Sequence, residues 1–315
     1  MDVEKKLLYI VIDLLLPLLI GYFLRRNRHL KDKFFDTMIH YNMLFFYPLL
    51  SVLSFWVLPL TWELIWLPVF GVLLCFIPGG AAYLLFGRKY ADPLDMGSYI
   101  ITAMLANLGT LGGLCAYIIY GETGFAYSQL IVVSQVFVIF LVCYPLARYY
   151  YRCSRGREQA AMSWQELVFT RNQLPVLGLL LGFLLCWLKV PRPALLGEFF
   201  DPLVHISAWT ALIPVGHATD FSAIRRYLFS TLDLAPIRFI VTPLISYGVA
   251  RLVFNDPVAI NTVLILASTP TAISAVMTAK IHGLNVHIAT ASFFSTTVLF
   301  LLLIYPVIFF CLTVH

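Results

Sequence analysis

Charged residues are scarce in this sequence. Only 12% of its 315 residues are Asp, Glu, Lys or Arg, whereas 61% are hydrophobic, and the mean hydropathy is +0.87. A soluble domain carries about 25% charged residues, so this chain cannot cover a water-facing surface. The short alternating segments of an outer-membrane barrel are also missing. Several apolar segments approach or exceed the roughly 20 residues that a helix needs to cross a bilayer. The composition therefore predicts an all-α polytopic membrane protein.

Motifs for metal binding and catalysis are missing as well. The six cysteines are scattered, without a Cys-x-x-Cys pair, which is typical of small packing residues and not of disulfides or metal clusters. His282 and His287 flank a short loop that has no further ligands. There is no His-Glu-x-x-His motif, no P-loop and no recognisable Ser/His/Asp set. We therefore expect no enzymatic activity, no cofactor and no bound metal.

Ten apolar segments are predicted to span the membrane. The first leads directly into a basic loop and has no small-residue cleavage pattern, so we expect it to be retained and not removed as a signal peptide. The predicted segments are 7–24, 34–58, 64–86, 97–120, 127–147, 166–188, 199–219, 227–254, 258–281 and 288–312.

A basic linker at residues 151–165 divides the chain into halves, 1–150 and 166–315, of five segments each. Basic residues concentrate in alternate loops, so the positive-inside rule places this linker in the cytoplasm and both termini outside the plasma membrane, or the inner membrane of a bacterium. These clusters are topology signals, and we expect no nucleic-acid partner. Because five is an odd number, the halves enter the membrane in opposite senses. This pattern predicts two inverted five-helix repeats.

The fourth segment of each half is interrupted near its middle. In the second half, Thr269 and Pro270 resemble an N-cap and the first residue of a new helix, inside a segment that is already apolar. In the first half, the glycine-rich run from Asn107 to Gly113 lies in the corresponding place. Interrupted backbone at membrane depth must line a cavity or be buried in protein. Paired interruptions indicate a transporter's binding site.

Two crossed, broken helices can form an anion site. Each second half-helix would point its free N–H groups and about half a positive charge towards the bilayer midplane. Asn107 would add an amide donor, and hydroxyls and glycines would allow close approach of the substrate. Packing of small residues between helices is the alternative explanation of the glycines. The predicted substrate-binding residues are Asn107, Gly109, Gly112, Gly113, Thr269, Pro270, Thr271, Ala272 and Gln135, with Ser134 as a weaker candidate.

The order of these motifs resembles the auxin efflux carrier (AEC) family. The runs that carry the resemblance are 106–112 with 121–124, and 268–272 with 279–283; Pro48, Pro175 and Pro214 resemble other landmarks. The resemblance covers nearly the whole chain. It implies ten helices with crossing helices four and nine, a scaffold of helices one, two, six and seven, and a mobile transport unit made of the others. It also implies a carboxylate substrate such as auxin or malate at the crossover. Leu114 stands where the family commonly has proline, which leaves open whether helix four is fully broken.

Several ionisable residues fall within the apolar segments. Asp13, His205 and His217 are candidates for proton coupling, because intramembrane ionisable groups are often functional. For Asp233 and Arg238 we expect either an ion pair with each other or a position near the membrane interface.

The leading hypothesis is a secondary active or facilitative transporter of a small organic anion that works by alternating access. A sodium-coupled carrier of the bile-acid symporter type and a membrane ligand sensor that does not transport are the alternatives. The substrate, the direction of transport and the ion coupling stay open, as does whether the protein forms a homodimer.

Overall fold

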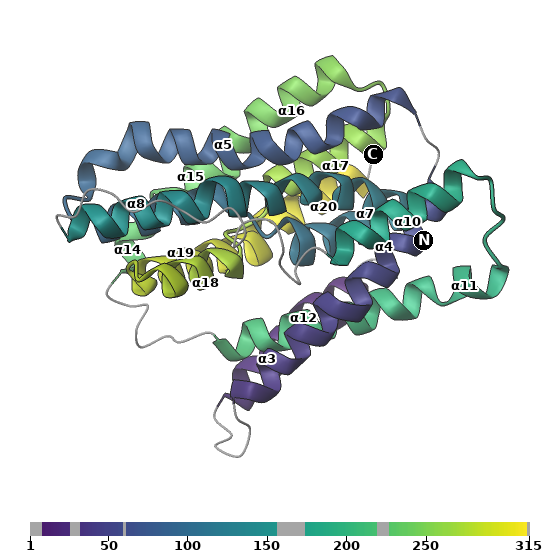
Figure 1. The fold of residues 1–315 in the computed structure, drawn as a ribbon, viewed down its shortest axis with the longest axis horizontal. Helices are drawn as coiled ribbons and strands as arrows, with labels where there is room; N and C mark the ends of the chain where they lie inside the picture. Colours follow the sequence, from purple (N-terminus) through teal and green to yellow (C-terminus); the bar gives the residue numbers. More distant parts are fainter. Residues whose placement is uncertain (1–7, 26–31, 59–60, 156–173, 219–226, 314–315) are drawn as a thin grey trace.

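A computed structural model describes residues 8–25, 32–58, 61–155, 174–218 and 227–313 (Figure 1), and within these ranges the regular structure is helical apart from one isolated β-bridge. Five helical runs are long and apolar enough to cross a membrane: Lys33–Trp56, Trp62–Lys89, Leu108–Ser154, Phe229–Val253 and Val286–Thr313. Shorter apolar helices cover Ile10–Leu24, Leu177–Trp187 and Pro257–Ala267. The structure thus supports a polytopic helical membrane protein, and the count of ten spans stays a prediction. Most of the predicted linker lies outside the described residues.

One group of helices forms a separate layer, which we call the panel (Figure 1). It consists of η1 (Ile10–Leu15), α2 (Leu16–Leu24), α3 (Asp32–Tyr41), η2 (Asn42–Phe46), α4 (Tyr47–Trp56), α10 (Leu174–Trp187), α11 (Ala194–Glu198) and α12 (Phe200–Ala218). Within it, α4 packs on α10 and α2 packs on α12. Glycines allow both contacts, because a Cβ at Gly178 would overlap the Pro48 carbonyl and one at Gly216 would overlap the Leu18 carbonyl.

The remaining helices form a larger group, the bundle (Figure 1). Its first half contains η3 (Trp62–Ile65), α5 (Trp66–Phe86), η4 (Gly87–Lys89), α6 (Pro93–Met104), η5 (Leu108–Gly112), α7 (Gly113–Val138), η6 (Ile139–Cys143) and α8 (Tyr144–Ser154). Its second half contains α14 (Leu228–Thr231), α15 (Leu234–Pro236), η8 (Ile237–Val241), α16 (Thr242–Val253), α17 (Pro257–Ala267), α18 (Ile273–His282), α19 (Val286–Leu299), η9 (Phe300–Ile304) and α20 (Tyr305–Thr313).

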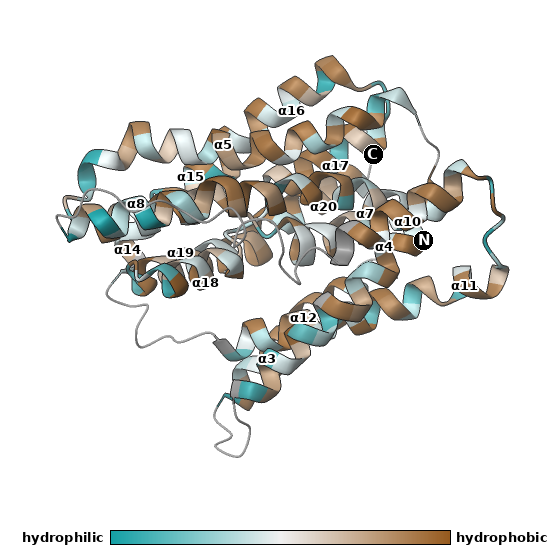
Figure 2. Cartoon of the chain, in the orientation of Figure 1, coloured by the Kyte–Doolittle hydropathy of each residue, from teal (hydrophilic) through white to brown (hydrophobic). Residues whose placement is uncertain are grey.

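Hydrophobic residues predominate along most helices of both groups (Figure 2), and many of the large ones are exposed. Leu84, Leu252 and Leu302 are large apolar residues that are 81%, 87% and 72% exposed. Such exposure is unfavourable in water and is favourable against lipid tails. The exposed surface is therefore that of a protein surrounded by a bilayer.

Prolines explain the wide π-helical turns in the long helices. The turns η1, η2, η6, η8 and η9 each end one residue before the helical residue that precedes a proline. Proline has no N–H and its ring clashes with the carbonyl four residues back, so an ordinary α-turn cannot continue through it. A wider turn lets the helix continue across the proline. The prolines concerned are Pro17, Pro48, Pro145, Pro243 and Pro306.

The predicted turn after the fourth segment is present inside α7. Gly121 has φ 64° and ψ −148°, which interrupts the helical conformation and reverses the chain. Residues with a side chain rarely adopt this backbone conformation, whereas glycine adopts it without a steric penalty because it has no Cβ. The fourth and fifth predicted segments are therefore two helices joined at this glycine.

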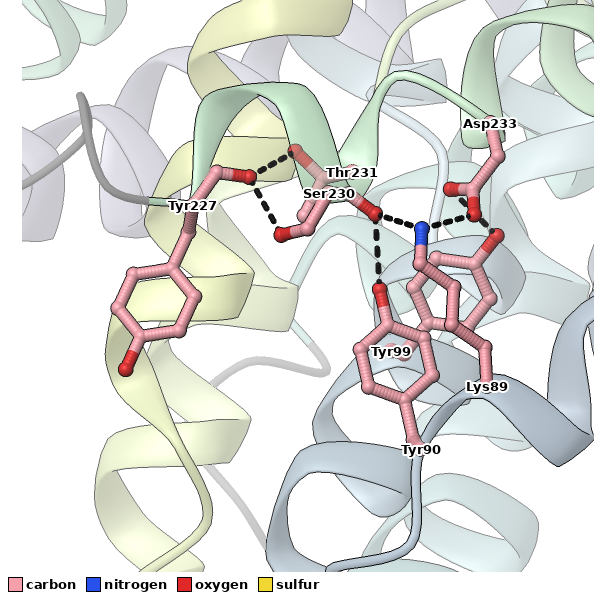
Figure 3. Close-up of polar contacts among 7 residues, drawn as sticks. All are labelled: Lys89, Tyr90, Tyr99, Tyr227, Ser230, Thr231 and Asp233. Atoms are coloured by element: carbon pink, nitrogen blue, oxygen red, sulfur yellow. Dashed lines mark hydrogen bonds and ion pairs between the residues drawn. The ribbon is translucent and has the colours of Figure 1, made fainter.

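A polar cluster ties η4, α6 and α14 together at one end of the bundle (Figure 3). The Lys89 ammonium lies 2.6 Å from a carboxylate oxygen of Asp233 and donates to the Ser230 carbonyl at 2.5 Å. The Tyr99 hydroxyl donates to the other Asp233 oxygen at 3.0 Å, and the Tyr90 hydroxyl donates to the Ser230 carbonyl at 3.0 Å. The predicted pairing of Asp233 with Arg238 is thus wrong, because Lys89 and Tyr99 occupy this carboxylate.

Candidate binding site at the crossing of two broken helices

The first interruption is a complete break. Helix α6 ends at Met104, and Leu105 follows in an extended conformation with φ −93° and ψ 106°. Asn107, with φ −79° and ψ 58°, precedes the restart at Leu108. Leu114, at the position where the family commonly has proline, lies within the second half-helix and does not prevent the break. The glycine-rich run therefore starts the second half-helix, and the break itself lies just before it.

The second interruption is longer than predicted. Helix α17 ends at Ala267, and α18 begins at Ile273, with Ala272 in an extended conformation as its N-cap. The predicted restart at Thr269 and Pro270 is wrong. A residue before proline is disfavoured in the α conformation, and Pro270 and Ala272 provide hydrogen bonds to the other break. The helix therefore restarts only at Ile273, after the residues that make these bonds.

The two breaks lie against each other and exchange backbone hydrogen bonds. The Asn107 N–H donates to the Pro270 carbonyl at 2.7 Å, and the Ala272 N–H donates to the Leu105 carbonyl at 2.8 Å. Ala106 and Thr271 thus form an isolated antiparallel bridge. Lipid offers no hydrogen-bond partners, so unwound backbone at this depth must be satisfied within the protein. Each break thus provides hydrogen-bond partners for backbone groups of the other.

Three of the predicted site residues support the crossing with their side chains. The Gln135 amide donates to the Ala106 carbonyl at 2.8 Å. The Thr271 hydroxyl donates to the Thr102 carbonyl at 3.1 Å, and the Thr269 hydroxyl donates to the Leu266 carbonyl at 2.7 Å. These groups hold the backbone in place, so the two threonine hydroxyls are not available as free donors in this conformation.

The side-chain amide nitrogen of Asn107 is a hydrogen-bond donor that is available for a ligand. Its side-chain oxygen accepts from the Leu111 N–H at 3.4 Å, as an N-cap does. Its amide nitrogen has no hydrogen-bond partner among the described residues, and the side chain is buried. A buried amide without a partner is costly. An acceptor such as a carboxylate oxygen would satisfy it.

A small recess, with room for little more than one water molecule, lies beside the first break between the panel and the bundle. Gly109 and Thr110 of η5 form one wall, and Tyr47 of α4 and Ser207 of α12 form the opposite wall. The Tyr47 hydroxyl hydrogen-bonds the Thr110 side chain, which links the panel to the broken helix. The other lining residues are Leu50, Leu114, Phe125, Val204 and Ala208. The lining is apolar with a few polar groups, as in small-ligand sites, and the recess would have to widen to admit a carboxylate.

The glycines of the predicted site have different surroundings. A Cβ at Gly112 would lie 3.1 Å from Thr269 Cγ2 and 3.3 Å from the Asn107 carbonyl oxygen, so this glycine allows the two half-helices to approach. Gly109 lines the recess. Gly113 faces Ser128 and Gln129 inside α7, away from the crossing.

A polar cluster in the panel, which includes the recess residue Ser207, was not predicted from the sequence. The Asn42 amide donates to the Ser207 carbonyl and to the Thr210 hydroxyl, each at 2.6 Å, and its oxygen has no partner among the described residues. The signal in the sequence was the polar Asn42 inside an apolar segment. Its partners, more than a hundred positions away, give no local signal.

Two of the three candidates for proton coupling lie together. Asp13 Oδ2 lies 2.6 Å from His205 Nδ1, and His205 Nε2 lies 3.5 Å from Asp201. Asp201 accepts hydrogen bonds from Tyr9 of the panel and from Tyr117 of the bundle. His217 is not part of this network, because it stacks on Phe35 at 3.7 Å near the end of α12.

Among the described residues, no three His, Cys, Asp or Glu side chains gather closely enough to hold a metal ion. No family model matches the chain. The sequence is similar to that of an uncharacterized transporter of Methanocaldococcus jannaschii, with 25% identity over 308 residues that cover 94% of this chain and 96% of the relative. This likeness extends over nearly the whole length of both chains and supports a transporter in general terms.

Proposed function

We propose that the protein carries a small organic anion, a carboxylate such as malate or auxin, across the plasma membrane by alternating access. The anionic group binds at the crossing, beside Asn107 and Gly109. The observation that carries this proposal is the meeting of two broken helices next to a recess between two helical groups. The similarity to a protein named as a transporter supports it.

The proposal assigns the chain to the AEC family, with inverted repeats at 1–150 and 166–315 and both termini outside. The helix pairings agree with such repeats. Helix α4 of the second segment packs on α10 of the sixth, and α2 of the first packs on α12 of the seventh. A pseudo-two-fold axis that relates the halves would exchange these pairs and would bring the fourth segment against the ninth. The breaks at 105–107 and 268–272 meet in this way.

The anion would be held mainly by N–H groups. The unpartnered Asn107 amide lies at the start of the second half-helix of segment four, where the helix dipole is positive. Gly109 has no side chain, so a substrate can approach the backbone at the recess. Tyr47 and Ser207 would enclose the site from the panel, with the Tyr47 hydroxyl directed to Thr110 and not to the anion.

Alternating access requires the bundle to move against the panel, and polar contacts at one end of their interface would have to break. Arg192 forms an ion pair with Glu122 and also donates to the Leu53 carbonyl at 2.9 Å. Tyr117 donates to Asp201. In the predicted topology these contacts lie on the outer side, so they would close the outward path in this conformation.

Proton coupling through Asp13 and His205 is part of the proposal. Protonation of His205 would strengthen its ion pairs with Asp13 and Asp201, and Asp201 also receives the Tyr117 hydrogen bond from the bundle. A proton at this position can therefore bias the contact between the two groups. The test is uptake driven by an imposed proton gradient, which His205→Gln should abolish while downhill exchange persists.

The first experiment is a thermal-shift screen of the purified protein with malate, indole-3-acetate and other carboxylates, because a ligand that binds the native state raises its apparent stability. The best binder is then radiolabelled and offered to proteoliposomes. We expect saturable uptake without a requirement for sodium. Binding without uptake would favour the sensor, uptake that requires a sodium gradient would favour the bile-acid type, and the absence of both would contradict the proposal.

A further inference from the structure

An arginine is completely buried in the bundle next to the crossing. Arg238 lies in the wide turn η8 and is 0% exposed. Its Nη2 donates to the Thr102 carbonyl at 3.1 Å, whereas Nε and Nη1 have no hydrogen-bond partner among the described residues. A buried charge without a counter-charge is expensive. The arginine therefore needs a source of negative potential.

No carboxylate among the described residues bonds to Arg238. Asp233, five positions earlier, is held by Lys89 and Tyr99 (Figure 3). Cys75 of α5 is close enough for an electrostatic interaction, and it is a thiol and not a carboxylate. The counter-charge must therefore come from the backbone or from a ligand.

The break in segment four provides this negative potential. Thr102 lies in the last turn of α6, and in an unbroken helix its carbonyl would accept from the N–H of residue 106. Because the helix ends at Met104, this carbonyl is free for other donors, and it receives the Thr271 hydroxyl and the Arg238 guanidinium. The end of a half-helix carries about half a negative charge. Arg238 thus faces the negative end that the break creates.

Unwound carbonyls and half-helix C-termini are the positions where coupling cations bind in transporters with broken helices. We propose that Arg238 is a built-in cation that takes the place of a coupling sodium ion at this crossing. The guanidinium is permanently charged, and it is attached to the bundle and moves with it. The carrier then needs no sodium for the crossing to form or for the anion to bind.

This inference deepens the proposed function, and it can be tested without an anion. The purified full-length protein is melted in sodium chloride and in choline chloride of equal concentration. Wild-type protein should melt at the same temperature in both salts. Arg238→Met removes the charge and keeps much of the apolar volume; its melting temperature should fall by several degrees, and sodium should restore part of the loss.

Arg238→Lys keeps the charge, so it should stay closer to wild type and should not respond to sodium. Arg251→Ala is the matched control, because Arg251 lies near the end of α16 in the same predicted segment and is exposed; it should melt like wild type. If Arg238→Met does not fold, the inference is tested by whether the wild type and Arg238→Lys each melt at the same temperature in sodium chloride and in choline chloride.

Sodium-specific stabilisation of the wild type or of Arg238→Lys would overturn the inference, as would wild-type stability of Arg238→Met in both salts. Because no anion is used, these outcomes are separate from a failure of anion transport. That failure would appear only in the carboxylate screen.

Discussion

The two breaks occupy corresponding places in the halves of the chain and are both buried, yet they differ in the residues that border them. The first is short, is capped by the Asn107 side chain and continues into Gly109 and Thr110, which line the recess. The second spans five residues, all buried, and its hydroxyl groups bond to nearby backbone carbonyls. The first break is thus arranged to meet a ligand, and the second is arranged to support the first.

Separating the two half-helices should have the largest effect. In Gly112→Val the new side chain would push against Thr269 Cγ2 and the Asn107 carbonyl. Overpacking of this kind costs about 1–3 kcal/mol, so we expect a lower melting temperature and loss of carboxylate uptake. Gly80→Ala in α5 is the control, because a Cβ there meets nothing within 4 Å. Wild-type melting and uptake in Gly112→Val would contradict the close crossing.

Substitutions of Asn107 should separate the capping role of its side-chain oxygen from the donor role of its side-chain nitrogen. Asn107→Asp keeps the oxygen that caps the Leu111 N–H, but it loses the amide N–H groups and adds a negative charge. We expect a folded protein in which carboxylates no longer raise the melting temperature. Asn107→Ala should lose the cap, worth about 1 kcal/mol, and bind more weakly. Unchanged carboxylate binding in both variants would remove Asn107 from the site.

Pro270→Ala should affect movement more than binding. Alanine restores an N–H and removes the main barrier to a continuous helix across the second break. We expect slower uptake in proteoliposomes, while the carboxylate-induced thermal shift stays close to that of the wild type. If binding falls as much as uptake, the second break contacts the anion directly, and the difference between the two breaks disappears.

The smallest effect should come from Tyr47→Phe. This change removes one hydroxyl that bonds the Thr110 side chain across the interface of panel and bundle. A hydrogen bond of this type contributes about 1 kcal/mol, so the melting temperature should fall slightly. Ser54→Ala, which removes a hydroxyl bonded within α4, provides the comparison. A complete loss of carboxylate binding in Tyr47→Phe would mean that this hydroxyl contacts the anion.

The sequence indicated both breaks only approximately, because the glycine-rich run marks the start of the second half-helix and Pro270 lies inside a longer break. It did not allow the restart at Ile273 to be predicted, because the extended residues before it are held by Leu105 and Asn107 of the other half. The pairing of Asp233 failed for a similar reason, since Lys89 lies far away in sequence. Features set by local stereochemistry were predictable, and features set by distant partners were not.

The β-bridge between Ala106 and Thr271 also constrains how the protein is made. The ribosome synthesises the first break long before its partner exists. Until the ninth segment arrives, the Leu105 carbonyl lacks its donor and the Asn107 N–H lacks its acceptor, and an unsatisfied backbone group in lipid costs several kcal/mol. Biogenesis must therefore keep the fourth segment in a hydrated or chaperoned environment, or as a provisional continuous helix, until the second half of the chain has been inserted.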